Sequence, residues 1–594
     1  MLERLVVRNF KRFEEVAIDL AQAVVLVGPN NSGKTSALQA LALWELGVRR
    51  WNEKRGGKKT PPAKRPGVTI NRRDLVSLPV PETNLIWRNL HVREVFRSND
   101  KQRTENVRID IEVHGVGEGQ SWTCGLEFDY ANPESLYCRP LGWASGEIGE
   151  GPPIPDQALG VKIAYLPPMS GLSANEDRVD PGAIQVRLGE GRTAEVLRNL
   201  CYRIHSEPDL RPGWDDLERS LRDLFGVMVE PPEYVPERGE LTMTYKDLNN
   251  IRFDISAAGR GLQQTLLLLA FLIGNPGSVL LLDEPDAHLE ILRQRQIYNA
   301  LTDVAGARGC QVIAATHSEV LLNEAADRDV VVAFVGTPHR IDDRGSQVLK
   351  ALKSIGFEQY YLAEQTGWVI YLEGPTDLAV LRAFARKLDH PAAALLERPF
   401  VHYIENRRKI GREHFYGLKE AKSDLVGVLL TDRIDDKIAS RDDLVEAQWE
   451  RREIESYLCF PEVLDAYAES LARERSPGPL FLESERAKLR EAMKRAVEAR
   501  VPPAALKNRE DRWWSSVKAT DDFLDPVFED FFDELGLANL MRKTDYHRLA
   551  PLVPKELLEH EIVEKLDLIV QVAERARPAD VDGHLAGRGD GASA

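Results

Sequence analysis

Two groups of residues in this chain could carry out phosphate chemistry. The first begins with a glycine-rich loop, GPNNSGKT, which follows an apolar run over residues 23–27 and precedes a predicted helix over residues 34–46. In such a loop the backbone N–H groups curl around phosphates, the lysine adds a point charge, and the last hydroxyl can bind Mg²⁺. The residues predicted to contact a nucleotide here are Asn30, Asn31, Ser32, Gly33, Lys34 and Thr35.

Two later segments supply acids and a histidine to the same group. Four apolar residues, VLLL, come directly before Asp283 and Glu284. A buried strand that ends there would let Asp283 hold Mg²⁺ and let Glu284 polarise the attacking water. A second apolar run ends at THS, so His317 is predicted to sense the γ-phosphate. We therefore expect ATP and Mg²⁺ as cofactors.

A further segment, SAAGRG, opens a predicted helix at Ser256 and includes Gly259. A serine cap and small residues at the amino end of a helix suit phosphate binding. Together with the loop and the acids, this segment resembles the ABC-type ATPases of the SMC/RecF branch, whose signature sequence it matches loosely. The resemblance implies a homodimer or higher homo-oligomer in which the signature helix of one ATPase head completes the site of another.

The second group consists of carboxylates at predicted strand ends in the last third of the chain. The run WVIYLEGPTD delivers Glu373 into a turn, with Asp377 at the start of a helix, and DLVGVLLTD ends at Asp432. Carboxylates from separate strand ends suit hard cations such as Mg²⁺, and two such ions can cleave a phosphodiester. This hypothesis requires that Glu373 and Asp432 lie close together in space. The alternative for Asp377 is an ordinary acid at a helix amino end.

These strand-end carboxylates resemble the TOPRIM fold of topoisomerases, primases and nucleases. An ATPase followed by a TOPRIM domain is the arrangement of the OLD (overcoming lysogenisation defect) family, which includes the nuclease of the Gabija antiphage system. The segment REIESYL is similar to the REIENYL segment of that family, which implies that Glu453 and Glu455 are further metal ligands. The resemblance also implies that Lys543 is a lysine of the cut site, although it could be an ordinary surface lysine.

One departure from the family leaves the function open. The second TOPRIM strand usually ends D-x-D, whereas here the second acid is Asp435, one residue later. Either Asp435 reaches the metal through a different turn, or cleavage is weak or absent. The favoured function is an ATP-regulated endonuclease that uses Mg²⁺ or Mn²⁺ on DNA in antiphage defence, with or without a companion protein. The alternatives are a non-cleaving ATP-driven DNA-binding sensor and an effector that cleaves RNA such as tRNA.

Two basic segments are candidates for contact with nucleic acid. Residues 49–73 are rich in Lys and Arg, and residues 406–422 mix basic side chains with His414, Phe415 and Tyr416. Basic groups neutralise phosphates, and exposed aromatic rings stack on bases. The alternatives are a solvated loop for the first segment, and a charged face with two core aromatics for the second.

The chain is long enough for several domains, since its 594 residues exceed a single core. The fold class is α/β: an ABC-type (SMC/RecF-like) P-loop ATPase domain with an inserted strand and helix elaboration, then a TOPRIM α/β domain and a helical C-terminal region. The predicted boundaries are 1–366 for the ATPase domain (insertion about 48–240, with dimerisation elements), 367–470 for TOPRIM, 471–577 for the helical part that completes the TOPRIM region, and 578–594 for a disordered tail.

Composition excludes other classes of protein. A hydrophobic content of 43% and a charged content of 29% are typical of soluble globular proteins, and no apolar run is long enough to span a membrane. The chain also lacks a cleavable apolar signal, so we expect a cytoplasmic protein without a membrane partner. Its five cysteines form no CxxC pair, which argues against a zinc site. The net charge of −16 leaves nucleic-acid binding to local basic patches.

Overall fold

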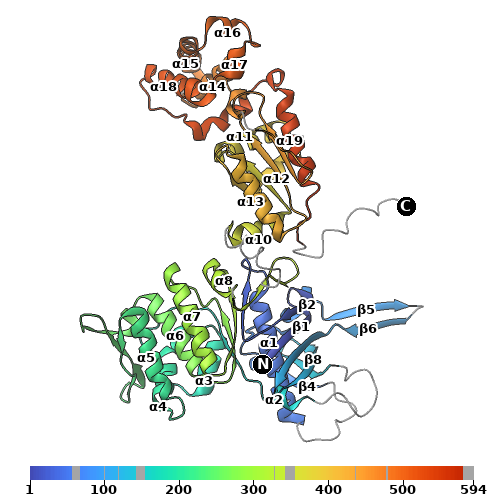
Figure 1. The fold of residues 1–594 in the computed structure, drawn as a ribbon, viewed down its shortest axis with the longest axis vertical. Helices are drawn as coiled ribbons and strands as arrows, with labels where there is room; N and C mark the ends of the chain where they lie inside the picture. The colour runs from blue at the N-terminus through green and yellow to red at the C-terminus, as the bar shows by residue number, and fades with distance from the viewer. Residues whose placement is uncertain are drawn as a thin grey trace. The chain divides into compact units, whose positions relative to one another are not determined.

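The computed structural model divides the chain into two compact units, Met1–Leu349 and Lys350–Ala594 (Figure 1). The residues it describes are 1–55, 67–98, 101–117, 119–141, 154–326, 328–341, 355–434, 437–475 and 479–579. Asp435, residues 56–66 of the first basic segment and residues 580–594 of the predicted tail lie outside them. Within the described ranges, none of the helices combines the length and the apolar character that a membrane crossing needs.

The first unit is built on a six-stranded sheet in which every neighbouring pair is parallel except the edge pair β18–β19. Its strands, in spatial order, are β10 (Ile163–Leu166), β16 (Val279–Asp283), β17 (Gln311–Thr316), β3 (Ala23–Val27), β18 (Val330–Ala333) and β19 (His339–Arg340). Strands β16 and β17 are buried along their whole length, as expected for a parallel sheet covered on both faces. The strands predicted at residues 23–27 and before Asp283 are confirmed.

A second, antiparallel sheet covers one side of this core. Its strands, in spatial order, are β2 (Phe13–Asp19), β1 (Leu2–Phe10), β7 (Ile109–Gly117), β8 (Gln120–Asn132), β9 (Ser135–Pro140) and β4 (Val68–Asn71). Helix α1 (Lys34–Arg55) lies between the two sheets, where its Leu38, Leu41 and Trp44 join one core with residues of both. The region predicted as an insertion, about 48–240, thus supplies four strands of this sheet and the edge strand β10.

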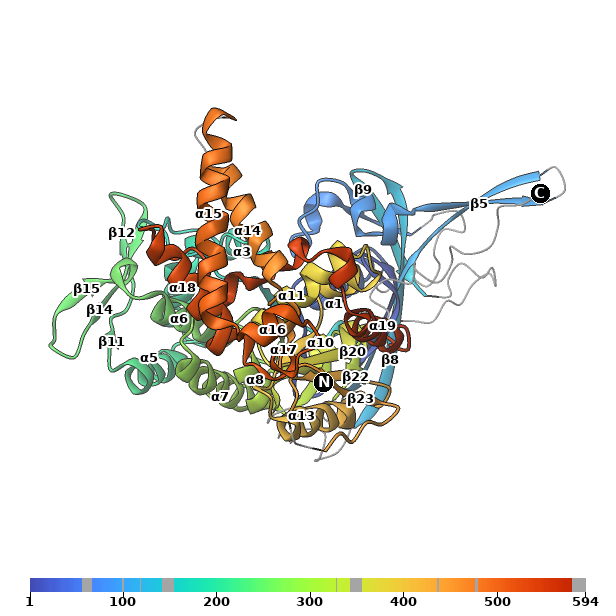
Figure 2. The same ribbon diagram turned by 90° about the horizontal axis from the view of Figure 1, so that it is seen from above.

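Helices cover the other face of the parallel sheet (Figure 1). The helices of the first unit after α1 are α2 (Asp156–Leu159), α3 (Pro181–Gly189), α4 (Leu197–Ser206), α5 (Pro212–Phe225), α6 (Arg260–Ile273), α7 (Ile291–Ala307) and α8 (Glu319–Ala325), with short 3₁₀ turns η1 (Arg72–Asp74), η2 (Thr83–Ile86), η3 (Arg88–Leu90), η5 (Thr193–Glu195) and η6 (Ile255–Ala257). Small strand pairs complete the unit: β5 (Arg93–Ser98) with β6 (Lys101–Asn106), β12 (Glu233–Val235) with β13 (Glu240–Thr242), and β11 (Met228–Val229) with β14 (Thr244–Lys246) and β15 (Arg252–Asp254). The β5–β6 hairpin projects away from the antiparallel sheet in both views (Figures 1 and 2).

The second unit contains a four-stranded parallel sheet. In spatial order its strands are β21 (Val401–Tyr403), β20 (Trp368–Leu372), β22 (Val426–Thr431) and β23 (Leu444–Gln448). Helices α11 (Pro375–Lys387) and α19 (His560–Ala573) pack on the face that carries Ile370 and Val428. Helices α10 (Phe357–Thr366) and α13 (Arg408–Ala421) pack against each other and against strands of this sheet. Helix α10 lies before residue 367 in the chain, yet it belongs to this second unit.

The rest of the second unit is helical and shares the core of its sheet. Its elements are α12 (Ala392–Glu397), η7 (Ile454–Tyr457), α14 (Pro461–Arg475), α15 (Pro479–Arg500), α16 (Pro503–Lys507), α17 (Arg512–Ser516), the π-helix η8 (Ala519–Leu524), α18 (Asp525–Glu534), η9 (Lys543–Leu552) and η10 (Lys555–Leu557). Helices α14 and α15 pack side by side (Figure 2). Two of the short elements, η7 and η9, carry predicted site residues.

Candidate functional site

The glycine-rich loop joins β3 to α1, and two of its glycines are required by space as well as by backbone angle. Gly28 has φ +155°, and a Cβ there would lie 2.8 Å from the carbonyl oxygen of Phe334. Gly33 has φ +106°, and a Cβ there would lie 2.9 Å from Cε1 of Phe13. Any side chain at these positions would clash. The two glycines therefore leave the backbone N–H groups of the loop accessible beside the amino end of a long helix, where phosphates bind.

Lys34 is the first residue of α1, directly after the loop, and it is buried. Its Nζ donates to the carbonyl oxygens of Gly28 and Pro29, at 2.7 Å each. Burial lowers the pKa of Lys34, and nearby acids, first of all Asp283, oppose that shift. The ammonium group is thus held against the loop by carbonyl oxygens that a phosphate could replace.

The three residues before Gly33 differ in exposure. Asn30 and Asn31 are exposed, and Asn31 adopts φ +62°, a left-handed conformation that asparagine tolerates. The Oγ atom of Ser32 is buried and has no hydrogen-bond partner among the described residues. A buried hydroxyl without a partner is costly, so this atom fits a loop that closes around a phosphate.

Asp283 lies at the end of β16 and accepts two hydrogen bonds from hydroxyl groups. Thr35 Oγ1 donates to Asp283 Oδ1 at 3.2 Å, and Tyr165 Oη donates to Asp283 Oδ2 at 3.2 Å. Burial raises the pKa of Asp283, and the two hydroxyl groups partly counter that shift. The structure therefore brings the loop threonine and the strand-end aspartate together, as a shared Mg²⁺ would require.

Glu284 follows at once, in a backbone conformation that is rare for a glutamate. Its φ is +52°, and its N–H donates to the carbonyl oxygen of Ala315 at 2.8 Å. The Glu284 Oε1 atom lies 3.8 Å from Nδ1 of His317. Strained backbone of this kind is concentrated at functional sites, because the fold must hold it against its cost. Glu284 and His317 thus face each other beyond the ends of β16 and β17.

Ser256 and Gly259 lie elsewhere in the first unit. Both are exposed, but Ser256 does not cap α6 as predicted: it lies in η6, where the side chain of Asp254 accepts from its backbone N–H at 2.8 Å, and Gly259 is the residue that precedes α6. Among the described residues, neither bonds to the phosphate loop. Arg198 donates to the same Asp254 carboxylate and so ties this turn to α4. Within one chain, the signature segment is separate from the nucleotide loop.

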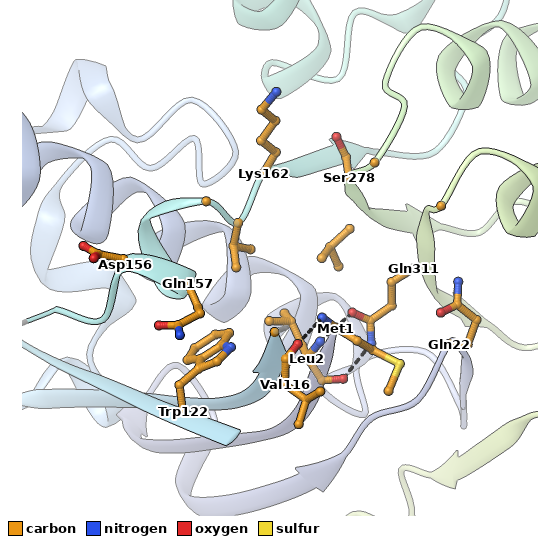
Figure 3. Close-up of a pocket in the computed structure, with 16 residues that line it drawn as sticks. Met1, Leu2, Gln22, Val116, Trp122, Asp156, Gln157, Lys162, Ser278 and Gln311 are labelled. Atoms are coloured by element: carbon orange, nitrogen blue, oxygen red, sulfur yellow. Dashed lines mark hydrogen bonds between the residues drawn. The ribbon is translucent and has the colours of Figure 1, made fainter. Parts of the chain in front are cut away.

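A cavity of about 590 Å³ lies at the opposite end of the parallel sheet (Figure 3). Its wall includes Lys162, Ser278 and Gln311, which stand at the amino ends of their strands. The Gln311 amide bonds to both the N–H and the carbonyl of Leu2, at 2.8 and 2.7 Å, and so joins the two sheets. None of the predicted site residues lines this cavity, because they follow the carboxyl ends of the strands.

In the second unit, Glu373 and Asp377 occupy the turn between β20 and α11. The backbone N–H of Glu373 donates to Asp377 Oδ2 at 3.2 Å, and Asp377 is buried in the first turn of the helix. Burial, and then the Glu373 carboxylate, raise the pKa of Asp377 to about 7. The ordinary role of an exposed acid at a helix amino end does not describe this buried side chain.

Asp432 follows β22, and its carboxylate lies beside that of Glu373. The side-chain Nδ2 of Asn406 donates to Glu373 Oε2 and to Asp432 Oδ2, the latter at 3.2 Å. The backbone N–H of Asp432 donates in turn to Asn406 Oδ1 at 3.1 Å. Burial and the neighbouring Glu373 raise the pKa of Asp432 to about 10. The two strand-end acids, 59 positions apart in the chain by their numbers, thus share one amide.

Glu453 and Glu455 flank the start of η7, and both are buried. Glu453 Oε1 accepts from the backbone N–H of Thr520 at 2.6 Å, which anchors that carboxylate. Glu455 Oε1 has no hydrogen-bond partner among the described residues. Burial, with Asp377 and then Glu453 as charged neighbours, raises the pKa of Glu455 to about 8.

Lys543, at the start of η9, is the basic neighbour of this cluster. Burial lowers its pKa, but the attraction of the carboxylates outweighs burial and the net shift is upward; the acids responsible, largest first, are Glu455, Glu373, Glu453 and Asp377. The six predicted side chains of this group that the structure describes therefore interact electrostatically.

Whether this cluster fits a divalent cation can be judged from its own atoms. Within the described ranges, no three His, Cys, Asp or Glu side chains converge closely enough to hold a metal ion as they stand. The cluster nevertheless has a surplus of buried negative charge and, in Glu455, a carboxylate oxygen without a donor. Buried carboxylates need a cation, a proton or hydrogen-bond donors, so the donor set fits a hard cation once its side chains close in.

The basic segment 406–422 does not offer three aromatic rings for stacking. His414 and Phe415 are buried, and the His414 ring stacks on His402 with centroids 3.8 Å apart. Arg408 is also buried and donates to Thr431. The prediction that His414 and Phe415 contact bases is therefore wrong, and the alternative of core aromatics under a charged face is right.

Three residues of these sites were absent from the sequence-based prediction. They are Tyr165 and Asn406, described above, and Asp286, which accepts from Thr316 Oγ1 and whose pKa is raised by burial. Asp286 lies three residues after Asp283 in the DEPD run, a signal that was available. Tyr165 and Asn406 stand in no recognisable motif, because their roles arise from the pairing of strands and the path of a loop.

Comparison with known proteins covers parts of this chain. Residues 192–323 match the family model described as "AAA domain, putative AbiEii toxin, Type IV TA system", and residues 1–45 match "AAA ATPase domain". The matched ranges include the glycine-rich loop, Asp283, Glu284 and His317. The chain therefore carries a P-loop ATPase domain, and ATP is its nucleotide. No curated protein matches the chain.

Solved structures that resemble the chain include heads of SMC proteins. One is an SMC head bound to the C-terminal winged-helix domain of ScpA, with 15% identity, a TM-score of 0.32, and coverage of 57% of this chain and 97% of that one. Another is the SMC head domain from Thermotoga maritima, with 14% identity, a TM-score of 0.29, and coverage of 57% and 98%. A third, derived from Pyrococcus furiosus, is an Smc head with an extended coiled coil bound to the C-terminal domain of ScpA, with 13% identity, a TM-score of 0.32, and coverage of 60% and 99%.

Proposed function

We propose that this protein is an ATP-regulated, divalent-metal-dependent endonuclease that acts on DNA. The first unit would bind and hydrolyse ATP, and the second would be a TOPRIM-type nuclease, the arrangement of the OLD family. The observation that carries the proposal is the meeting of buried carboxylates from three separate segments, with Glu373, Asp432 and Glu455 as representatives, beside a lysine. A structural core has no need for so many unneutralised acids, because each costs free energy to bury.

In the nucleotide site, each residue has a role that follows from its present contacts. Lys34 would exchange two carbonyl oxygens for phosphate oxygens, which carry more negative charge. Thr35 and Asp283, already hydrogen-bonded to each other, would hold Mg²⁺. Glu284 would orient the attacking water, and His317 would contact the γ-phosphate, since both side chains face the space beyond the strand ends.

In the second unit, Glu373, Asp377, Asp432 and Glu455 would hold Mg²⁺ or Mn²⁺. When bound, such ions activate water and stabilise the leaving oxygen of a phosphodiester. Glu453, whose carboxylate is tied to the Thr520 backbone, would hold η7 in place and contribute charge. The Lys543 ammonium would pair with a substrate phosphate and neutralise the charge that develops as the bond breaks.

Two further observations support the wider proposal. Ser256 and Gly259 are exposed, so the signature segment would be accessible to the nucleotide of a second copy, as a head-to-head homodimer requires. The family model matched by residues 192–323 is named after a toxin of a toxin–antitoxin system, which favours a role in defence against phage. A companion protein would be compatible with that role.

The test is cleavage of supercoiled plasmid by the purified protein with Mg²⁺ or Mn²⁺. We expect Glu373→Ala to abolish nicking and to leave ATP hydrolysis intact, because the variant changes only the second unit. The matched control is Glu413→Ala, an exposed glutamate of α13 whose charge partner is Lys409, and it should cut like the parent. Plasmid cleavage by Glu373→Ala at the parent rate would show that the proposed site is not the cutting site.

A second candidate function is a non-cleaving, ATP-driven DNA sensor. It is favoured by the absence, within the described ranges, of three side chains close enough to hold a metal ion as they stand. A titration of Mn²⁺ separates the two candidates: nicking that disappears in Asp432→Ala supports the nuclease, and DNA binding without any cut supports the sensor. Adding tRNA to the same assay reveals an RNA-cleaving effector, which would cut tRNA and spare the plasmid.

A further inference from the structure

Asn406 is the residue that joins the two strand-end acids, and the backbone around it is unusual. It lies in the loop between β21 and α13 with φ +59°, and the preceding residue, Glu405, has φ +48°. Two successive left-handed residues other than glycine are uncommon, and asparagine is among the few that tolerate this conformation. The backbone N–H of Glu405 donates to the carbonyl of Glu373 at 3.2 Å, so the loop is tied directly to the acidic turn.

The orientation of the Asn406 amide follows from its partners. Its Oδ1 accepts from the backbone N–H of Asp432, which can only donate. The Nδ2 group must therefore point the other way, toward the carboxylates of Glu373 and Asp432, which can only accept when ionised. An amide nitrogen carries two hydrogens, so both bonds can form at once. All three contacts agree on one orientation, and a flipped amide would lose every one of them.

This bridge has a direct consequence for the two acids. Neighbouring carboxylates repel each other when both are ionised, and the raised pKa of Asp432 reflects the charge of Glu373 beside it. The amide holds Oε2 of Glu373 and Oδ2 of Asp432 to one nitrogen, beside the contact that the two carboxyl groups make with each other. Hydrogen bonds to ligating carboxylates from outside the coordination sphere fix their direction in metal sites generally.

We propose that Asn406 is a positioning residue for a divalent cation in the second unit, because its side-chain amide holds Glu373 and Asp432 converged before the cation arrives. The inference rests on the proposed function, in which this cluster binds Mg²⁺ or Mn²⁺. Asn406 acts through the two acids and does not itself contact the cation. Its removal therefore weakens cation binding and leaves the rate at saturating cation near that of the parent.

The experiment measures Mn²⁺ affinity by electron paramagnetic resonance on the full-length protein without nucleic acid. Asn406→Gly removes the amide at a position with φ +59°, which glycine adopts without strain, so the loss of the side chain adds no backbone strain. We expect its affinity for Mn²⁺ to fall about 10- to 100-fold, the usual effect of removing a residue that hydrogen-bonds to the metal ligands. In the cleavage assay, the Mg²⁺ concentration for half-maximal rate should rise by a similar factor, with little change in kcat.

The matched control is Asp389→Gly, which replaces an exposed left-handed residue of the same unit, with φ +49°, after the last turn of α11, whereas the acids Glu373 and Asp377 lie at its start. It should bind Mn²⁺ like the parent. Circular dichroism without metal checks that each variant is folded, and Asn406→Ala repeats the test if the glycine variant is not. Affinity equal to or tighter than that of the parent in a folded Asn406 variant overturns the inference and leaves the proposed function standing. A parent protein that binds no Mn²⁺ overturns both.

Discussion

The two sites of this protein are built on the same plan and differ in how their acids are balanced. In the first unit the nucleotide residues follow the carboxyl ends of β3, β16 and β17, and in the second the carboxylates follow β20 and β22. Parallel strands place loops and helix amino ends at that edge, where ligands of open α/β sheets bind. The shared topology therefore explains why both sets of residues converge, although it does not explain what each set binds.

The two sites differ in how the charge of their acids is compensated by hydrogen-bond donors and basic side chains. Asp283 accepts hydrogen bonds from two hydroxyl groups and lies near Lys34, and these contacts partly oppose the rise in its pKa that burial causes. In the second unit, Asp432 and Glu373 share a single amide, and the Lys543 ammonium interacts with the other acids, Glu455, Glu373, Glu453 and Asp377. The first site is prepared for an anion such as a nucleotide phosphate. The second gathers acids whose pKa values are raised, and under the proposed function a cation from solution would complete it.

The largest expected effect is that of Lys34→Ala, which should impair the nucleotide site and leave the second unit unaffected. Lys34→Ala should weaken ATP binding by about 10- to 100-fold, because hydrogen bonds to charged groups contribute about 1.5–3 kcal/mol each. The same variant should leave Mn²⁺ binding in the second unit unchanged. Isothermal titration with ATP and, separately, with Mn²⁺ measures both quantities. Lys162→Ala, a change of an exposed lysine at the opposite end of the sheet, is the matched control and should affect neither. Loss of Mn²⁺ binding in Lys34→Ala would contradict the independence of the sites.

A smaller effect concerns the stability of the metal-free protein. Burial and the neighbouring Glu373 raise the pKa of Asp432 well above its ordinary value, so above about pH 4 the folded second unit binds a proton that the unfolded chain releases. Asp432→Asn removes this cost and should raise the unfolding free energy of the second unit by at least about 1 kcal/mol. Asp283→Asn should change stability less, because Asp283 already has two hydroxyl donors.

Urea unfolding in the presence of a chelator measures both variants. A lower unfolding free energy for Asp432→Asn than for the parent would contradict this prediction. It would mean that the hydrogen bonds of Asp432 stabilise the fold by more than its burial costs.

A third effect is the dependence of cation stabilisation on pH. The pKa of Asp377 is about 7 and that of Glu455 about 8, both above the values in an unfolded chain. The folded, metal-free state therefore binds protons more tightly than the unfolded state, and its stability falls as pH rises from about 4 to about 8. Mg²⁺ replaces those protons, so the melting temperature gained on adding Mg²⁺ should grow from about pH 6 to about pH 8. Thermal scans in two buffers test this, and an increment that is the same at both values would contradict it.

The sequence predicts the nucleotide loop well because its parts are contiguous. Glycine spacing, an apolar strand and a helix are all local, and the structure has the strand β3 and a helix that begins at Lys34. The pair of Glu373 and Asp377 is local in the same sense. Glu453, Glu455 and Lys543 are distant from that pair, and only a resemblance to known nucleases suggested them. Their electrostatic interaction is a property of the folded second unit.

One misreading and one omission of the sequence analysis have physical causes. His414 and Phe415 were grouped with basic residues by composition, yet the buried positions of α13 include Gly411, His414, Phe415 and Leu418. A spacing of three and four residues is typical of the buried face of an amphipathic helix, and periodicity would have outweighed composition. Asn406 could not be predicted, because its role depends on a left-handed loop that places one amide between two strand ends.

The smallest effect probes a single hydrogen bond of the nucleotide site. Tyr165→Phe removes one of the two hydroxyl donors to Asp283, which costs about 1 kcal/mol. The Mg²⁺ concentration needed for half-maximal ATP hydrolysis should therefore rise roughly fivefold. The matched control is Tyr298→Phe, which removes an equivalent bond from a tyrosine to Asp329, at 2.8 Å, elsewhere in the same unit. Both variants should lose similar stability, but only Tyr165→Phe should shift the Mg²⁺ dependence. An equal shift in both would mean that Tyr165 supports the fold without tuning Asp283, and the balance of charge in the first site would then depend on Thr35 and Lys34.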